Sequence, residues 1–283
     1  MRIYKYWIKK IGTMPDGQSI CCRGVSDKSM ADAENAADQK IELFKKVSKE
    51  KSFSGEIKDK ILKLSGVVVR EGSYESPICE DIIEVLNEKN IITRNRYGAM
   101  ILNSEDHVFI DIDSPPLSFL EKLGIFSKPE GDKAKERIVQ MVHRVAAAKY
   151  SDLSFSIYET AKGIRLLLSS RTFKASALET KKLFRDFHTD RLYERLCRQQ
   201  NCFRARLTPK PNRIKMESCT KFNCPNAGEE NRSKMDKWIA EYDSKAEKYA
   251  TCRLIGKIGS PAKSPVMDCH DKITKVAAKL SLA

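Results

Sequence analysis

Apolar and polar positions along the N-terminal part of the chain predict a hairpin followed by helices. Residues 2–11 alternate aromatic or aliphatic with basic side chains, and residues 18–24 follow a turn and can return as the partner strand. The alanine- and lysine-rich stretch 29–50 opens with a capping pattern that predicts a helix. Residues 56–64 and 78–89 are also predicted to be helical.

The middle of the chain has the order of a sheet backed by helices. Apolar residues 99–103 and 108–113 are predicted to form a hairpin, and 132–149 has the helical spacing of an apolar face. Residues 153–158 and 164–168 form a second predicted hairpin, with a glycine in its turn. This order predicts an α+β fold in which an antiparallel sheet is backed by helices.

The last third of the chain is predicted to be mainly helical. Helices are expected at 176–188, 190–200, 230–248 and 265–281, with a strand at 201–207. Three regions follow from the whole pattern. They are an N-terminal α/β region, an α+β core and a mainly helical C-terminal region, at residues 1–97, 98–213 and 214–283.

The run Val108–Asp113 ends a predicted strand with two carboxylates one residue apart. Side chains alternate along a strand, so Asp111 and Asp113 leave the backbone on the same face. A divalent Mg²⁺ or Mn²⁺ would relieve their repulsion, because hard cations prefer oxygen ligands. The pattern has two interpretations, a metal-and-phosphate site or a strand that ends with two exposed acids beside Ser114–Pro116.

The net charge of the chain predicts a polyanionic partner. The formal net charge is +14, from 52 basic and 38 acidic residues, which favours nucleic acid or nucleotides over a membrane surface. The alternative is a solvated basic surface. No apolar run reaches the length of a membrane span, and Met1–Trp7 lacks the pattern of a signal peptide, so a cytoplasmic location without membrane contact is expected.

Two basic segments are candidates for contacts with phosphates. Arg94, Arg96 and Tyr97 combine guanidinium forks with an aromatic ring, which suits phosphate and base contacts, although a polar loop with a packed tyrosine explains them too. The predicted strand at 201–207 places two arginines on one face, and a lysine follows it. These three residues are Arg204, Arg206 and Lys210, and their alternative is again a solvated face.

The cysteines do not indicate a metal centre. Nine cysteines without a regular spacing are expected to be reduced thiols in a cytoplasmic chain of this size. The spacing of the later ones does not match a compact zinc motif, so zinc is not expected and these cysteines are interpreted as structural. They are Cys219, Cys224, Cys252 and Cys269. The adjacent pair His270–Asp271 is expected at a helix surface.

Several segments together resemble an uncharacterised family of bacterial proteins, and that resemblance implies no particular function. The segments are Thr93–Ala99, Phe109–Asp113, Phe203–Pro211, Tyr249–Arg253 and His270–Asp271. A more distant similarity joins residues 98–211 to the archaeo-eukaryotic primase superfamily, also called primase-polymerases. That resemblance implies an RRM-like catalytic sheet.

The primase resemblance also implies roles for individual residues. Asp111 and Asp113 match the first motif, a hydrophobic strand that ends in Asp-x-Asp and holds Mg²⁺ or Mn²⁺. Arg165 follows the glycine turn where those enzymes have a phosphate-binding histidine, and arginine binds phosphate but is no acid or base. In that role Arg165 must lie on the strand beside the one that ends in Asp113, and the two-residue alternation of 164–168 puts it on the face of the acids. That face is expected to be open, so the loss of Arg165 is expected to leave the fold intact. Asp190 is the candidate for the third acid. The basic stretch that follows corresponds to Arg204, Arg206 and Lys210.

Four functions remain open from the sequence. The first is metal-dependent nucleotidyl transfer of the primase-polymerase type, with Asp111, Asp113 and Asp190 as catalytic residues. The second is non-catalytic nucleic-acid binding on a degenerate core, and the third is a metal-dependent nuclease that uses the same acids. The fourth is an adaptor that meets protein partners through its C-terminal helices.

Overall fold

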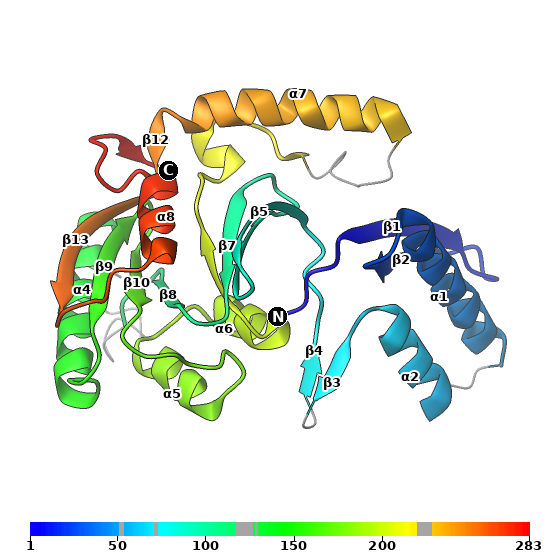
Figure 1. The fold of residues 1–283 in the computed structure, drawn as a ribbon, viewed down its shortest axis with the longest axis horizontal. Coiled ribbons are helices and arrows are strands. Elements are labelled where there is room, and N and C mark those ends of the chain that lie inside the picture. The colour runs from blue at the N-terminus through cyan, green and yellow to red at the C-terminus, as the bar shows by residue number, and fades with distance from the viewer. Residues whose placement is uncertain (51–53, 71–72, 117–126, 128–129, 220–227) are drawn as a thin grey trace. The chain divides into compact units, whose positions relative to one another are not determined.

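The computed structural model describes the chain except for residues 51–53, 71–72, 117–126, 128–129 and 220–227 (Figure 1). The described residues form two compact units. The first unit comprises residues 1–82, 94–98 and 218–241, and the second comprises residues 83–93, 99–217 and 242–283. These units differ from the three regions expected along the chain.

The first unit begins with the predicted hairpin and helix. Strands β1 (Tyr6–Thr13) and β2 (Ser19–Ser26) pair antiparallel, and helix α1 (Met30–Glu50) packs on them. The helix lies so close that a Cβ at Gly24 would be 1.8 Å from the carbonyl oxygen of Ala33. Small residues on both sides therefore permit this contact.

The described part of the first unit also contains two helices and a short strand pair. Helix α2 (Gly55–Leu64) begins at an N-cap serine, as expected for this residue type. Strands β3 (Val68–Arg70) and β4 (Ser73–Glu75) form a small antiparallel pair. Helix α7 (Gly228–Ala246) belongs to the first unit along most of its length.

The helix predicted at residues 78–89 is wrong. Strand β5 (Asp81–Asn87) occupies this place and forms a sheet edge beside β6 (Asn90–Arg94). Its β-branched residues Ile82, Ile83 and Val85 favour a strand, because branching at Cβ restricts side-chain rotamers in a helix.

Two four-stranded sheets form the core of the second unit, with the orders β13-β9-β10-β8 and β11-β7-β6-β5. The strands not yet defined are β7 (Met100–Ser104), β8 (Val108–Ile112), β9 (Phe155–Thr160), β10 (Ile164–Leu168), β11 (Phe203–Arg206) and β13 (Cys252–Ile258). The β9–β10 hairpin is as predicted, and its strands pair antiparallel.

Strands β7 and β8 do not form the predicted hairpin, because they belong to different sheets. The Ser104 hydroxyl accepts hydrogen bonds from the backbone amides of Asp106 and His107, which turns the chain out of β7. Strand β7 then pairs with β11, a hundred positions further along the chain, while β8 pairs with β10.

Helix α6 (Arg191–Gln200) covers the other edge of β8. The Tyr193 hydroxyl donates to the carbonyl of Phe109 at 2.8 Å, and the Asp190 amide donates to the carbonyl of Asp111 at 3.1 Å. The amide of Arg204 on β11 donates to the same tyrosine oxygen at 3.4 Å. Tyr193 therefore bridges the two sheets.

Helices cover both faces of the sheet that contains β8 and β10 (Figure 1). Helix α4 (Gly131–Lys149) is the predicted amphipathic helix, and its Val139 lines one pocket together with Ile164 of β10. Helix α8 (Pro265–Thr274) lies over the opposite face, where His270 contacts the rings of Phe109 and Tyr158. All five residues of β10 are buried as a result.

The C-terminal region is less helical than expected. Strand β13 adds an edge to the core sheet, and the short strands β12 (Tyr249–Ala250) and β14 (Ser281–Leu282) pair parallel. The last helix ends at Thr274 rather than near residue 281, because Lys275 adopts a left-handed conformation with φ of 58°. Helix α5 (Leu178–Asp186) completes the second unit.

The class α+β with antiparallel sheets and helices is thus confirmed. None of the helices in the described part of the chain combines the length and apolar character that a membrane crossing requires.

Candidate phosphate-binding site

A bidentate ion pair joins the two central strands of the core. Arg165 of β10 lies directly opposite Asp111 of β8 in the antiparallel register. The Nε of Arg165 is 2.7 Å from Oδ1 of Asp111, and its Nη2 is 3.1 Å from Oδ2. The prediction that Arg165 lies beside the acid-bearing strand and faces the same side is therefore confirmed.

The face that carries this pair is covered, whereas an open face was expected. Arg165 is 2% exposed, and its Nη1 also donates to the carbonyl of Arg206 at 2.9 Å and contacts the Cys252 thiol at 3.7 Å. Helix α8 places His270 over the neighbouring rings on this face. Arg165 is consequently part of the core, so we expect its loss to destabilise the fold, unlike the loss of an arginine on an open face.

Asp111 is held as a carboxylate by its partner. Burial acts to raise its pKa, but the charge and hydrogen bonds of Arg165 outweigh burial, and the pKa of Asp111 is lowered. Both of its oxygens contact the guanidinium. A metal ion at Asp111 would have to compete with this pair for the same oxygens.

Asp113 lies beyond the end of β8 and is exposed. No hydrogen bond or ion pair joins its carboxylate to another described residue. The turn before β10 fits closely against this segment, because a Cβ at Gly163 would lie 2.0 Å from the carbonyl oxygen of Ile112 and 3.0 Å from the Cα of Asp113. Only glycine permits this approach, so Gly163 positions the end of the acid-bearing strand.

Asp113 interacts electrostatically with two basic side chains. Its charge acts on the pKa of both Lys210 and Arg213, which places it near each of them. Lys210 is also repelled by the charges of Arg206, Arg213 and Lys162. We call Lys162, Arg206, Lys210 and Arg213 the basic cluster.

Burial and mutual repulsion lower the pKa values of side chains in the basic cluster. Burial first, and then repulsion from Arg165, lower the pKa of Arg206 to about 10, although Asp111 opposes this shift. The Nε of Arg206 is buried and has no hydrogen-bond partner among the described residues. The pKa values of Lys210 and Arg213 are lowered as well, in each case mainly by burial. An anion bound here would offset the repulsion and restore partners to these groups.

Two predicted site residues lie apart from the basic cluster. The carboxylate of Asp190 accepts a hydrogen bond from the amide of Tyr193 at 2.8 Å, so it is the N-cap of α6. Its backbone, not its side chain, contacts Asp111. Arg204 is 7% exposed and donates to Oε1 of Gln200 at 2.6 Å, within its own unit.

The remaining candidates belong to the first unit. Arg94 is buried and donates to the carbonyl of Gly98 at 2.8 Å, which supports the loop that follows β6. Arg96 stacks over the ring of Tyr97, 4.6 Å from its centroid, and also contacts the phenol oxygen. Tyr97 is 43% exposed, so this stacked pair is accessible rather than packed in the loop.

His270 was missed by sequence reasoning, which placed it at a surface. It is fully buried, its Nδ1 lies 2.8 Å from Asp271, and its Nε2 has no partner among the described residues. Burial lowers its pKa. The sequence could have predicted this burial, because His270 lies on the same face of the helix as other buried residues. These are Val266, Met267 and Thr274.

No group of three His, Cys, Asp or Glu side chains in the described ranges is arranged to hold a metal ion. Mg²⁺ or Mn²⁺ at the acid pair thus remains a prediction. Cys219 is buried and contacts the carbonyl of Arg96, and Cys224 lies outside the described residues. The described cysteines are free thiols.

Comparisons with family models, curated proteins and solved structures find no match for this chain. The function is therefore argued from the site alone.

Proposed function

We propose that this protein binds phosphate groups of a nucleic acid or nucleotide at the basic cluster. The observation that carries the proposal is the excess of positive charge near Asp113, whose carboxylate forms no ion pair with the residues that the structure describes. Five basic side chains and two acidic ones interact electrostatically there, which leaves three positive charges in excess. The seven residues are Lys162, Arg165, Arg206, Lys210, Arg213, Asp111 and Asp113.

The ion pair Arg165–Asp111 supports this function because it positions one member of the basic cluster, Arg206. Its bidentate geometry fixes both side chains, and Arg165 also holds the backbone of Arg206. The Arg206 side chain interacts electrostatically with Lys210 and forms no ion pair with an acidic residue in the described part of the chain. Positioned guanidinium groups of this kind bind phosphate oxygens with geometric specificity.

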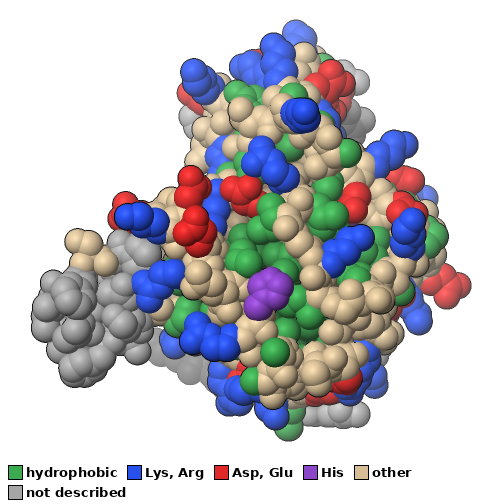
Figure 2. Space-filling view, turned by 90° about the vertical axis from the view of Figure 1, so that its left-hand side faces the viewer, with side chains coloured by type: hydrophobic (Ala, Val, Ile, Leu, Met, Phe, Trp, Pro, Cys, Tyr) green, Lys and Arg blue, Asp and Glu red, His purple; other side chains and the backbone are tan. Residues whose placement is uncertain are grey.

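Overall charge alone would not locate such a site. On the face shown in Figure 2, Lys and Arg side chains are interspersed with Asp and Glu side chains and with hydrophobic ones. The net charge of +14 therefore does not form an unbroken basic surface on that face. The local arrangement of the basic cluster is the more specific argument.

Calorimetric titration with a nucleoside triphosphate tests the proposal. We expect saturable binding that weakens when Lys210 and Arg213 are both replaced by alanine. The double variant Lys181→Ala/Lys182→Ala on α5 removes the same charge from two exposed positions and should bind like the wild type. Equal affinity in all three proteins would contradict the assignment of the site.

A second candidate is metal-dependent nucleotidyl transfer on a primase-polymerase-like core. It is favoured by the position of Asp113, an exposed carboxylate that interacts with Lys210 of the basic cluster and lies two residues from Asp111. A cation held by Asp113 would bridge to bound phosphates, as hard cations do in phosphoryl transfer. The ion pair of Asp111 argues that binding without catalysis is the simpler function.

Incubation of a labelled primer–template with nucleotides and Mn²⁺ separates these functions. Extension that is lost in Asp113→Asn supports transfer, and shortening of the strand supports a nuclease. Binding without any change in strand length supports the non-catalytic function.

A further inference from the structure

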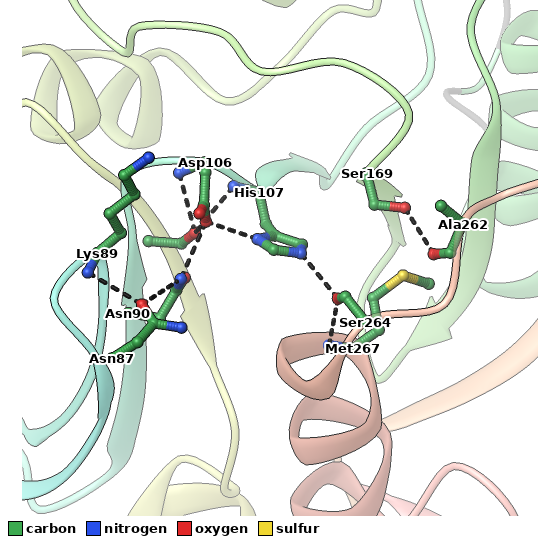
Figure 3. A network of polar contacts seen from close by, with 10 residues as sticks. Asn87, Lys89, Asn90, Asp106, His107, Ser169, Ala262, Ser264 and Met267 are labelled. Atoms are coloured by element: carbon green, nitrogen blue, oxygen red, sulfur yellow. Dashed lines mark hydrogen bonds and ion pairs between the residues drawn. The ribbon is translucent and has the colours of Figure 1, made fainter.

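Three side chains of the second unit form a hydrogen-bonded chain outside the phosphate site (Figure 3). The Nδ1 of His107 lies 2.7 Å from Oδ1 of Asp106, and its Nε2 lies 2.8 Å from Oγ of Ser264. Asp106 and His107 occupy the turn between β7 and β8, whereas Ser264 is the N-cap of α8. Carboxylate, imidazole and hydroxyl in this order are the arrangement that activates a nucleophilic serine.

The surroundings of Asp106 fix the direction of these hydrogen bonds. Its Oδ1 also accepts from the Asn90 amide at 3.0 Å and from the Ser104 hydroxyl at 3.1 Å. Burial acts to raise the pKa of Asp106, but the hydrogen bonds from His107, Asn90 and Ser104 outweigh it and lower the pKa. A carboxylate here accepts the Nδ1 proton of His107, which leaves Nε2 free to accept the proton of Ser264.

Ser264 lies at a position that is accessible and rich in amide donors. It is half-buried, between the exposed residues Lys263 and Pro265. Its Oγ also accepts from the amide of Met267 at 3.2 Å, which orients the hydroxyl. The amide of Val266, in the first turn of α8, has no acceptor within the helix and can donate to a developing oxyanion.

We propose that Ser264 is the nucleophile of a separate hydrolytic site that cleaves acyl esters, with His107 as its general base and Asp106 as the positioning residue. The Ser264 oxygen bonds to the carbonyl carbon while its proton moves to Nε2 of His107. His107 then gives this proton to the leaving alcohol as the ester bond breaks. Water repeats both steps on the acyl-serine, releasing the acid and restoring Ser264.

A fluorophosphonate reagent, which reacts with activated serines, tests this inference on the full chain. We expect one adduct per chain, mapped to Ser264 by peptide mass spectrometry, and a burst of nitrophenol from p-nitrophenyl acetate. In His107→Gln the labelling rate should fall by about a hundredfold, the typical contribution of a positioned base. In His107→Ala, added imidazole should restore part of the rate.

Two variants separate catalysis from helix capping. Ser264→Asn keeps a good N-cap and removes the nucleophile, so labelling should vanish while the circular dichroism spectrum is unchanged. Ser169→Ala removes a neighbouring hydroxyl that donates to Ala262, and it should label like the wild type. If His107→Gln fails to fold, Asp106→Asn serves instead and should also slow labelling.

Two outcomes would overturn the proposal. One is a folded wild-type protein that takes up no reagent at Ser264. The other is labelling of Ser264 that proceeds at the same rate without His107 or without Asp106. Either result would leave Ser264 as a helix cap that holds the β7–β8 turn through His107.

Discussion

The pair Asp111–Arg165 allows a quantitative test of the core. Replacing Asp111 by alanine leaves the guanidinium of Arg165 charged and only 2% exposed. Removing one partner of a fully buried ion pair costs about 3–5 kcal/mol of the free energy of unfolding. The Asp111 side chain is 29% exposed, so the pair is partly screened, and we expect about 3 kcal/mol, the lower end of this range.

Replacing the other partner, Arg165, should lower the free energy of unfolding by a smaller amount. In Arg165→Met the apolar volume is largely kept, and the remaining carboxylate can take a proton or reach water. We expect a loss of about 1–2 kcal/mol, typical of an unsatisfied polar group. The double variant Asp111→Ala/Arg165→Met has no unpaired charge, so it should be more stable than Asp111→Ala alone.

Urea unfolding monitored by far-ultraviolet circular dichroism measures these differences. Both tryptophans, Trp7 and Trp238, belong to the first unit, so their fluorescence reports separately on that unit. The reasoning is refuted if Asp111→Ala and Arg165→Met each change stability by less than about 0.5 kcal/mol, the level of ordinary surface substitutions.

Three further variants test other parts of the account. Burial lowers the pKa of His270, so its contribution to stability is present above about pH 6.5 and is lost as the pH falls below this value. His270→Phe should therefore reduce the pH dependence of the thermal midpoint between about pH 7 and 5, and an unchanged pH profile would contradict this. Gly163→Ala forces a Cβ against Ile112, so it should destabilise the protein and weaken nucleotide binding in calorimetry; wild-type values for both would mean that the close approach is unimportant. Tyr193→Phe removes the hydroxyl that bridges the two sheets and should cost about 1 kcal/mol in urea unfolding, whereas no loss would show that the bridge adds no stability.

Local patterns predicted the elements around the site well. The glycine turn and the alternation of residues 153–168 predicted the β9–β10 hairpin, and the two-residue period placed Arg165 on the face of Asp111. Both follow from geometry within a few residues of the chain. Helix α1 was predicted from its capping pattern, and helix α4 from apolar residues at helical spacing.

These local patterns could not predict which strands pair when they are far apart in the sequence. Nothing in residues 99–113 indicates that β7 pairs with β11 rather than with β8, because the partner lies about a hundred positions away. Amphipathic spacing shows that a helix has a buried face, but not which sheet it covers. The closed site under α8 and the ion pair of Asp111 were missed for this reason, as was the link from His107 to Ser264.

The salt dependence of nucleic-acid binding tests the central claim most directly. Anisotropy titrations of a labelled single-stranded oligonucleotide across salt concentrations give the slope of log affinity against log salt, which is about −0.7 per phosphate contact. Lys210→Ala/Arg213→Ala should reduce this slope by about 1.4, the value for two contacts, while Lys181→Ala/Lys182→Ala leaves it nearly unchanged. Equal slopes in both double variants, or no binding by the wild type at low salt, would contradict phosphate binding at the basic cluster.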